Sequence, residues 1–249
     1  MEWWEVLVIS FAGLWAGTIN TVVGSGTLVT FPVLVALGYP PVTATTSNAI
    51  GLVPGTIAGA WGYRHELGER SGSLRSLAVA SFFGALGGSA LLLTLPHDAF
   101  ETVVPWLVGL SVALVAVQPL LTKWLGTRNT DAKPGPLLFF LIFLIGIYGG
   151  YFTAAQGIML VGVMGLLMPD TVQRLNAVKN GLSAVVNLVA GAVYAVVAPV
   201  SWPVVGLLAV SSTCGGLLGA RIGRKLPPLV LRIVIVVIGV AAVVHMVME

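Results

Sequence analysis

Long apolar stretches with few charged residues run through most of this chain. An α-helix needs about 20 apolar residues to cross the hydrocarbon core of a bilayer. Stretches of that length lie at roughly 44–62, 75–95, 101–121, 174–197, 203–221 and 229–247. Only 8% of the 249 residues are charged, whereas a soluble domain carries about 25%. These features predict an all-α integral membrane protein.

Shorter apolar stretches form two pairs. The first pair, 5–20 and 27–38, is joined by a Gly-Ser-Gly break, and the second pair is 136–152 and 157–168. A stretch of about 12 residues is too short to cross the membrane alone. We therefore expect each pair to be a hairpin of broken helices. Irregular backbone is tolerated at membrane depth only where it is buried in protein or lines a polar cavity.

The basic residues predict the orientation of the segments. They cluster in four regions: Arg64, Arg70 and Arg75; Lys123, Arg128 and Lys133; Arg174 and Lys179; and Arg221, Arg224, Lys225 and Arg232. Loops rich in Lys and Arg face the cytoplasm. We therefore expect a multi-pass protein of the inner (plasma) membrane with both termini external. The first hairpin then enters from outside and the second from inside.

The two halves of the chain are related by an internal repeat. One constant offset in numbering relates Asn48 to Asn180, Gly84 to Gly216 and Pro96 to Pro228. Combined with the opposite orientations, it predicts inverted-topology repeats within one membrane domain, at 1–125 and 126–249. Each repeat is a broken-helix hairpin followed by three transmembrane helices. In such folds the substrate site lies near the midplane, where interrupted helices meet.

The hairpin tips are the first candidate site. A Gly-Ser-Gly turn lets backbone N–H groups point into a cavity, and the helix after it presents free N–H groups and a positive dipole end that suit an anion. The alternative is that these glycines only turn the chain. The candidate tip residues are Asn20, Gly24, Ser25, Gly26 and Thr27 in the first hairpin, and Gln156 and Gly157 in the second.

Polar residues follow each hairpin at helical spacing. Asn176, Asn180, Ser183 and Asn187 fall on one face of a helix, and Ser47 and Asn48 occupy the matching segment of the first half. Asparagine in a membrane helix either bonds a neighbouring helix or binds substrate. We expect the stripe to line a cavity, with Asn48 and Asn180 as the leading pair.

Lys179 is an ionisable residue inside a predicted span, which by default indicates a functional role. There it would supply the positive charge that an anion requires. The alternative is that its side chain reaches the membrane interface. Both interpretations stay open at this point.

No acidic residue lies at the centre of a span, so a carboxylate relay for protons and a carboxylate site for sodium have no candidate. Cys214 is the single cysteine, which excludes a multi-cysteine metal site. We expect no metal, no cofactor and no nucleic-acid partner. The expected partners are the lipid bilayer and a small anionic substrate, and a homodimer stays open.

Several motifs resemble a known family. The run from Ala16 to Gly26, then Phe31-Pro32 and Ser47-Asn48, resembles the first half of the sulfite exporter TauE/SafE family. The run from Gly146 to Gly150 and Asn176 to Asn180 resembles its second half. The resemblance implies a multi-pass permease for sulfite, sulfonates or related anions. The family favours a glycine-rich second tip, where this chain has Gln156, so the second tip would bind through backbone or through that side chain.

These observations favour a transporter that carries a small anion, a sulfur oxyanion or organosulfonate, by alternating access between the hairpin tips. An anion channel and a transporter of small carboxylates are the alternatives. A membrane enzyme would need a nucleophile–base pair or a metal cluster inside the spans, and the sequence contains neither.

Overall fold

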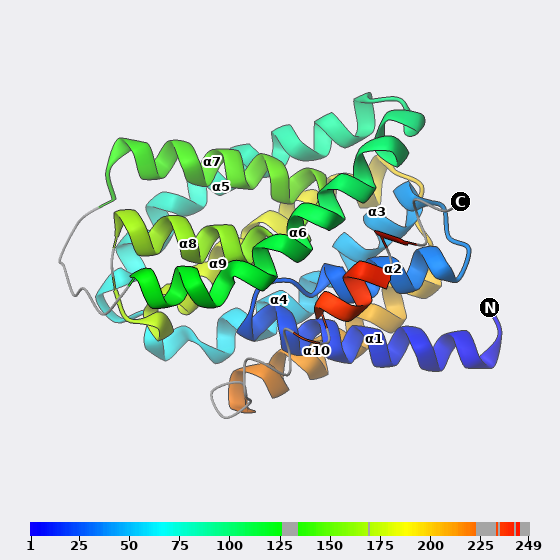
Figure 1. The fold of residues 1–249 in the computed structure, drawn as a ribbon, viewed down its shortest axis with the longest axis horizontal. Helices are drawn as coiled ribbons and strands as arrows, with labels where there is room; N and C mark the ends of the chain where they lie inside the picture. Colours follow the sequence, from blue (N-terminus) through cyan, green and yellow to red (C-terminus); the bar gives the residue numbers. More distant parts are fainter. Residues whose placement is uncertain (126–133, 169, 223–232, 234, 242, 245–249) are drawn as a thin grey trace.

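Helices form the whole of the described fold (Figure 1). The computed structural model describes residues 1–125, 134–168, 170–222, 233, 235–241 and 243–244, and no strand occurs among them. The helices are α1 (Trp3–Val22), α2 (Thr27–Ala36), α3 (Pro41–Gly51), α4 (Val53–Gly62), the short η1 (Arg64–Glu66) and η2 (Gly68–Arg70), α5 (Ser71–Thr94), α6 (His97–Leu125), α7 (Pro136–Tyr151), α8 (Gln156–Leu167), α9 (Val172–Val197) and α10 (Trp202–Ile222).

Five helices within the described ranges are long and apolar enough to cross a bilayer. They are α1, α5, α9 and α10 together with the stretch Ala99–Val117 of α6. The shorter apolar helices are α2, α7 and α8. This arrangement confirms the prediction of an all-α integral membrane protein.

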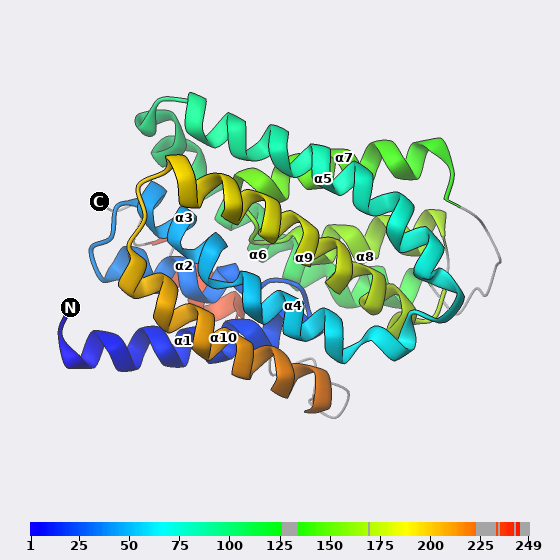
Figure 2. The same cartoon turned by 180° about the vertical axis from the view of Figure 1, so that it is seen from behind.

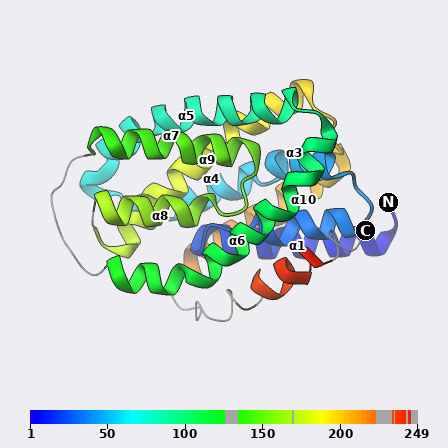
Figure 3. The same ribbon diagram turned by 45° about the horizontal axis from the view of Figure 1, so that its top comes forward.

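The two hairpins enter the bundle from opposite ends. In Figure 1, α1 runs from the N-terminus towards the middle of the bundle and α2 returns to the same end. From the opposite end, α7 runs towards the middle and α8 returns. The view from behind agrees (Figure 2). The tilted view in Figure 3 shows α6 passing beside α8, and these two helices are in contact.

The predicted segment 44–62 is two helices and not one. α3 ends at Gly51 and α4 begins at Val53, with Leu52 between them. Pro54 causes the break, because proline has no amide hydrogen and its ring clashes with the carbonyl four residues earlier. The corresponding helix of the second half, α9, is continuous over 26 residues.

The first arm of the first hairpin is longer than the expected 5–20. α1 covers 20 residues, and its start is fixed by Glu5, whose carboxylate accepts a hydrogen bond from the Glu2 amide at 2.7 Å. The last predicted segment, 229–247, is described only in part, and its described residues from 235 to 241 are helical. Arg128, Lys133, Arg224, Lys225 and Arg232 lie outside the described residues.

Small residues allow two helix pairs to pack closely. α1 packs along α10, and α5 packs along α7. A Cβ atom at Gly17 would collide with the carbonyl oxygen of Ser212, and one at Gly88 with that of Ile147. Backbones that approach this closely are typical of helix packing in membranes. Each pair packs the first arm of a hairpin, α1 or α7, against a longer helix, α10 or α5.

Candidate functional site

The two hairpin tips touch each other through their backbones. The Gly157 amide donates a hydrogen bond to the Gly24 carbonyl oxygen at 3.2 Å. A Cβ at Gly24 would lie 2.6 Å from the Gly157 Cα, and one at Gly157 would lie 2.5 Å from the Gly24 Cα. Gly24 also has φ of 95°, which disfavours any side chain. Both positions therefore require glycine.

Threonine and asparagine side chains extend this contact. The hydroxyls of Thr27 and Thr153 are 3.2 Å apart and join the two hairpins. Asn48, from α3, donates to the Thr27 hydroxyl at 3.1 Å and accepts a hydrogen bond from Thr30. The ring of Phe31 packs edge-on against that of Phe152, with centroids 5.2 Å apart. Asn48 thus fixes the side chains at the start of α2.

Lys179 lies inside the protein and does not reach the interface. Its side chain is fully buried, and Nζ donates to the carbonyl oxygens of Asn20 and Thr21, each at 3.0 Å. Asn180 Nδ2 also donates to the Thr21 carbonyl, at 3.2 Å. These contacts cap the C-terminal end of α1. The snorkelling interpretation of Lys179 is therefore wrong.

The same helix caps the other hairpin. Tyr194, one turn before the end of α9, donates its hydroxyl hydrogen to the Gly150 carbonyl oxygen near the end of α7. Its side chain is almost completely buried. α9 therefore contacts the interrupted end of both hairpins.

Some buried polar atoms near the tips have no hydrogen-bond partner. They include Ser25 Oγ in the first tip and Gln156 Nε2 in the second. On α9, Asn187 Oδ1 is also buried without a partner. The exposed fractions of Ser25 and Gln156 are 0% and 2%. A buried polar group without a partner costs free energy. The two tips therefore each present one unsatisfied side-chain donor, an arrangement suited to an anionic ligand.

The comparisons with known proteins identify the family. The sequence pattern of the sulfite exporter TauE/SafE family matches residues 9–246. The chain belongs to the sulfite exporter TauE/SafE family. This membership confirms the resemblance found in the sequence.

Curated relatives of this TauE/SafE protein carry transporter names. A "Probable membrane transporter protein" of Haemophilus influenzae is 25% identical over 228 residues, which cover 89% of this chain and 85% of the relative. The protein YfcA of Escherichia coli K12, with the same description, is 26% identical over 222 residues, covering 88% and 79%. ORF9 of a Sinorhizobium species is 22% identical and covers 93% and 88%. Family and relatives are multi-pass membrane transporters and not enzymes.

The predicted site residues of this TauE/SafE chain divide into two groups. Asn20, Gly24, Ser25, Gly26, Thr27, Asn48, Gln156, Gly157, Lys179 and Asn180 lie at the tips or bond directly to them. Ser47 lies elsewhere, because its hydroxyl accepts a hydrogen bond from the Ser201 amide at 2.9 Å. Asn176 is half-buried and Asn187 is buried. Among the described residues, neither is hydrogen-bonded to a tip.

The sequence reasoning missed Thr30, Thr153 and Tyr194. Thr30 follows Thr27 by three positions and so lies on the same face of α2. Tyr194 continues the polar stripe of α9, because it follows Asn187 by seven positions, about two helical turns. Extending the stripe towards the end of the segment would have found Tyr194. Nothing in the sequence singles out Thr153.

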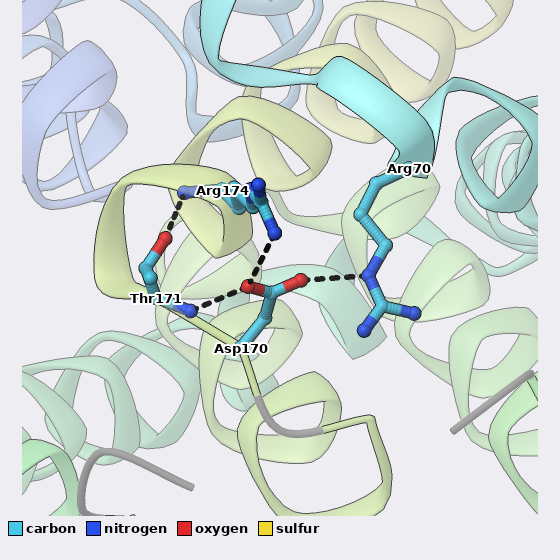
Figure 4. Close-up of polar contacts among 4 residues, drawn as sticks. All are labelled: Arg70, Asp170, Thr171 and Arg174. Carbon is cyan, nitrogen blue, oxygen red and sulfur yellow. Dashed lines mark hydrogen bonds and ion pairs between the residues drawn. The ribbon is translucent and has the colours of Figure 1, made fainter. Parts of the chain in front are cut away.

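An ion-pair network lies at the turn between α8 and α9 (Figure 4). Asp170 accepts a hydrogen bond from Arg70 Nε at 2.6 Å and from the Thr171 amide at 2.7 Å, and Arg174 lies 3.5 Å away. Burial acts to raise the pKa of the Asp170 carboxyl, but the Arg70 and Thr171 hydrogen bonds and the two positive charges hold that pKa below its ordinary value. The network ties η2 to the start of α9.

Proposed function

We propose that this protein transports a small anion, sulfite or an organosulfonate or related sulfur oxyanion, by alternating access around a site between the hairpin tips. One observation carries the proposal. Ser25 and Gln156, one in each tip, are buried donors without partners. A bound anion would accept hydrogen bonds from both, and charge-assisted hydrogen bonds of this kind are strong.

The charges around the tips support an anion over a cation. Lys179 brings a positive charge to the end of α1, next to the first tip. Among the described residues, no salt bridge joins an acidic side chain to Lys179. Because the charge lacks a carboxylate partner, it can offset the charge of a bound anion. A cationic substrate would be repelled by the same lysine.

The second tip would hold the anion through a side chain. The Gly157 amide already donates to Gly24, so it is not free for substrate while the tips touch. The side chain of Gln156 fills this role, and Gly149 leaves room for it, because a Cβ there would lie 2.6 Å from the Gln156 amide carbon. We therefore assign recognition at this tip to Gln156.

The proposed architecture is a pair of inverted repeats at 1–125 and 126–249, with the basic loops cytoplasmic and the termini external. The opposite directions of the hairpins support it (Figure 1). The helix packing supports it as well. The repeat would relate α1 to α7 and α10 to α5, and α1 packs along α10 as α7 packs along α5. An anion that leaves a negative-inside cell gains about 2.3 kcal/mol per charge for each 100 mV. Export through such a protein would proceed without a coupling ion.

The decisive experiment compares Ser25→Ala with wild type in proteoliposomes that take up radiolabelled sulfite. We expect a rise of about tenfold in the half-saturating concentration, because one hydrogen bond to a charged group is lost. We also expect an unchanged or higher melting temperature, because an unpaired buried hydroxyl disappears. The matched control is Ser76→Ala, whose hydroxyl bonds its own helix at Ser73.

The outcomes separate the alternatives. Unchanged affinity for sulfite in Ser25→Ala would refute the assignment of the anion site to the tips. If the wild-type protein transports carboxylates but neither sulfite nor sulfonates, the proposed substrate class is refuted. Saturable, slow flux indicates a carrier, whereas very fast, unsaturable flux would indicate an anion channel.

A further inference from the structure

The end of α1 presents backbone carbonyl groups that its own helix does not use. The helical bonds stop at Ile19, whose carbonyl oxygen accepts from the amides of Val23 and Gly24 at 2.7 and 3.1 Å. The next two carbonyls, of Asn20 and Thr21, point to α9. The C-terminal end of a helix carries roughly half a negative charge. This end is therefore suited to a cation.

Broken helices of secondary transporters use such ends to bind coupling ions. Unwound carbonyls and the C-terminal ends of half-helices hold the sodium ion or proton in several of these folds. Here the Asn20 and Thr21 carbonyls are both occupied by Lys179 Nζ, at 3.0 Å each. The lysine ammonium is a compact single positive charge. It has the same charge as a sodium ion and uses the same kind of oxygen ligand.

We propose that Lys179 is a covalently tethered substitute for a coupling cation, so that anion transport by this protein requires no sodium. The inference rests on the proposed function and adds the ion requirement of the same site. A tethered ammonium group does not have to bind and dissociate with each transported anion. The group that takes the place of a coupling ion is thus part of α9 itself.

The second hairpin supports this interpretation. At the end of α7, the Gly150 carbonyl accepts a hydrogen bond from the Tyr194 hydroxyl, and the amide of Phe152, the first residue after α7, donates to the Tyr148 carbonyl at 2.7 Å. In the part of the chain that the structure describes, no cluster of three or more His, Cys, Asp or Glu could hold a metal ion. The capped end of α7 therefore offers sodium no ready alternative to the position of Lys179.

The test measures radiolabelled sulfite uptake by proteoliposomes in sodium buffer and in buffer where N-methylglucamine replaces sodium. We expect wild-type rates within about twofold of each other, and a loss of at least about tenfold for Lys179→Ala without sodium. Sodium or ethylammonium should restore part of that loss by occupying the vacated space. Sodium should also raise the melting temperature of Lys179→Ala and leave that of wild type unchanged.

The control is Arg64→Ala, which removes an exposed positive charge stacked on Trp61 and should resemble wild type in both buffers. A wild-type protein that requires sodium would overturn the proposal. So would a folded Lys179→Ala variant that transports normally without sodium, or one that neither cation rescues or stabilises. If Lys179→Ala does not fold, Lys179→Thr takes its place. Absence of wild-type flux in both buffers would instead count against the proposed function.

Discussion

The amide of Gly157 donates a hydrogen bond to the carbonyl oxygen of Gly24, so at these two glycines the hairpins meet backbone to backbone. The contact brings Ser25 and Gln156 to the same region from opposite halves of the chain. It also makes the tips sensitive to the smallest change in volume at either glycine.

Gly157→Ala should abolish transport, because the added methyl group would lie 2.5 Å from the Gly24 Cα and must push the tips apart. The matched control is Gly162→Ala in the same helix, where a Cβ meets nothing within 4 Å. That control should keep full activity and gain up to about 1 kcal/mol from the better helix propensity of alanine. Sulfite uptake together with thermal unfolding in detergent checks both. Equal activity in the two variants would contradict the assigned tip contact.

Asn48→Ala should reduce transport and lower stability by about 1–3 kcal/mol, because the buried hydroxyls of Thr27 and Thr30 lose a partner. Asn176→Ala, on the half-buried start of α9, should change neither quantity by a comparable amount. Initial uptake rates and melting temperatures measure the two effects. A fully active Asn48→Ala protein would remove Asn48 from the site.

Tyr194→Phe should slow transport while the protein stays folded, because the Gly150 carbonyl at the end of α7 loses its hydroxyl partner. The cost in stability should be about 1–3 kcal/mol, as for other buried carbonyls left unpaired. Tyr39→Phe provides a matched control at a residue outside the hairpin contacts. Uptake by Tyr194→Phe that matches the control would show that this cap does not position the second tip.

Asp170→Asn should destabilise the protein at neutral pH by about 1–3 kcal/mol, because it removes the charge that pairs with Arg70. The pKa of Asp170 is lower in the folded than in the unfolded protein. Its contribution is therefore complete above the unfolded pKa of about 3.9 and disappears as the pH falls through the folded value. Melting curves against pH should show the two proteins converging in acid. A constant difference down to pH values well below 3.9 would contradict this pairing.

The sequence was sufficient for the kind of fold and for the hairpins. Runs of apolar residues predicted the long helices, because the length of a spanning helix follows from the thickness of the bilayer. The occurrence of a helix break in each half of the chain predicted that the tips belong together. The break at Leu52 was missed because the apolar pattern continues across it, although Pro54 marked the position.

The details of the site depend on packing that no local pattern specifies. A lysine near the end of a span has the same sequence signature whether it reaches the interface or turns inwards to Asn20 and Thr21. No local pattern distinguishes Thr153 from other threonines, and only the packing of the two hairpins places its hydroxyl 3.2 Å from that of Thr27. Ser47 stands beside Asn48 in the chain, yet its side chain points to Ser201 and not to the tips.

The hydrogen bond between Gly157 and Gly24 uses backbone atoms alone, so it does not depend on which side chains stand at positions 25 and 156. Under the proposed function, replacing Ser25 or Gln156 would alter which anion is recognised while the contact between the two glycines remained. A lineage built on this framework would then acquire new substrates by changing a few positions around an unchanged backbone contact.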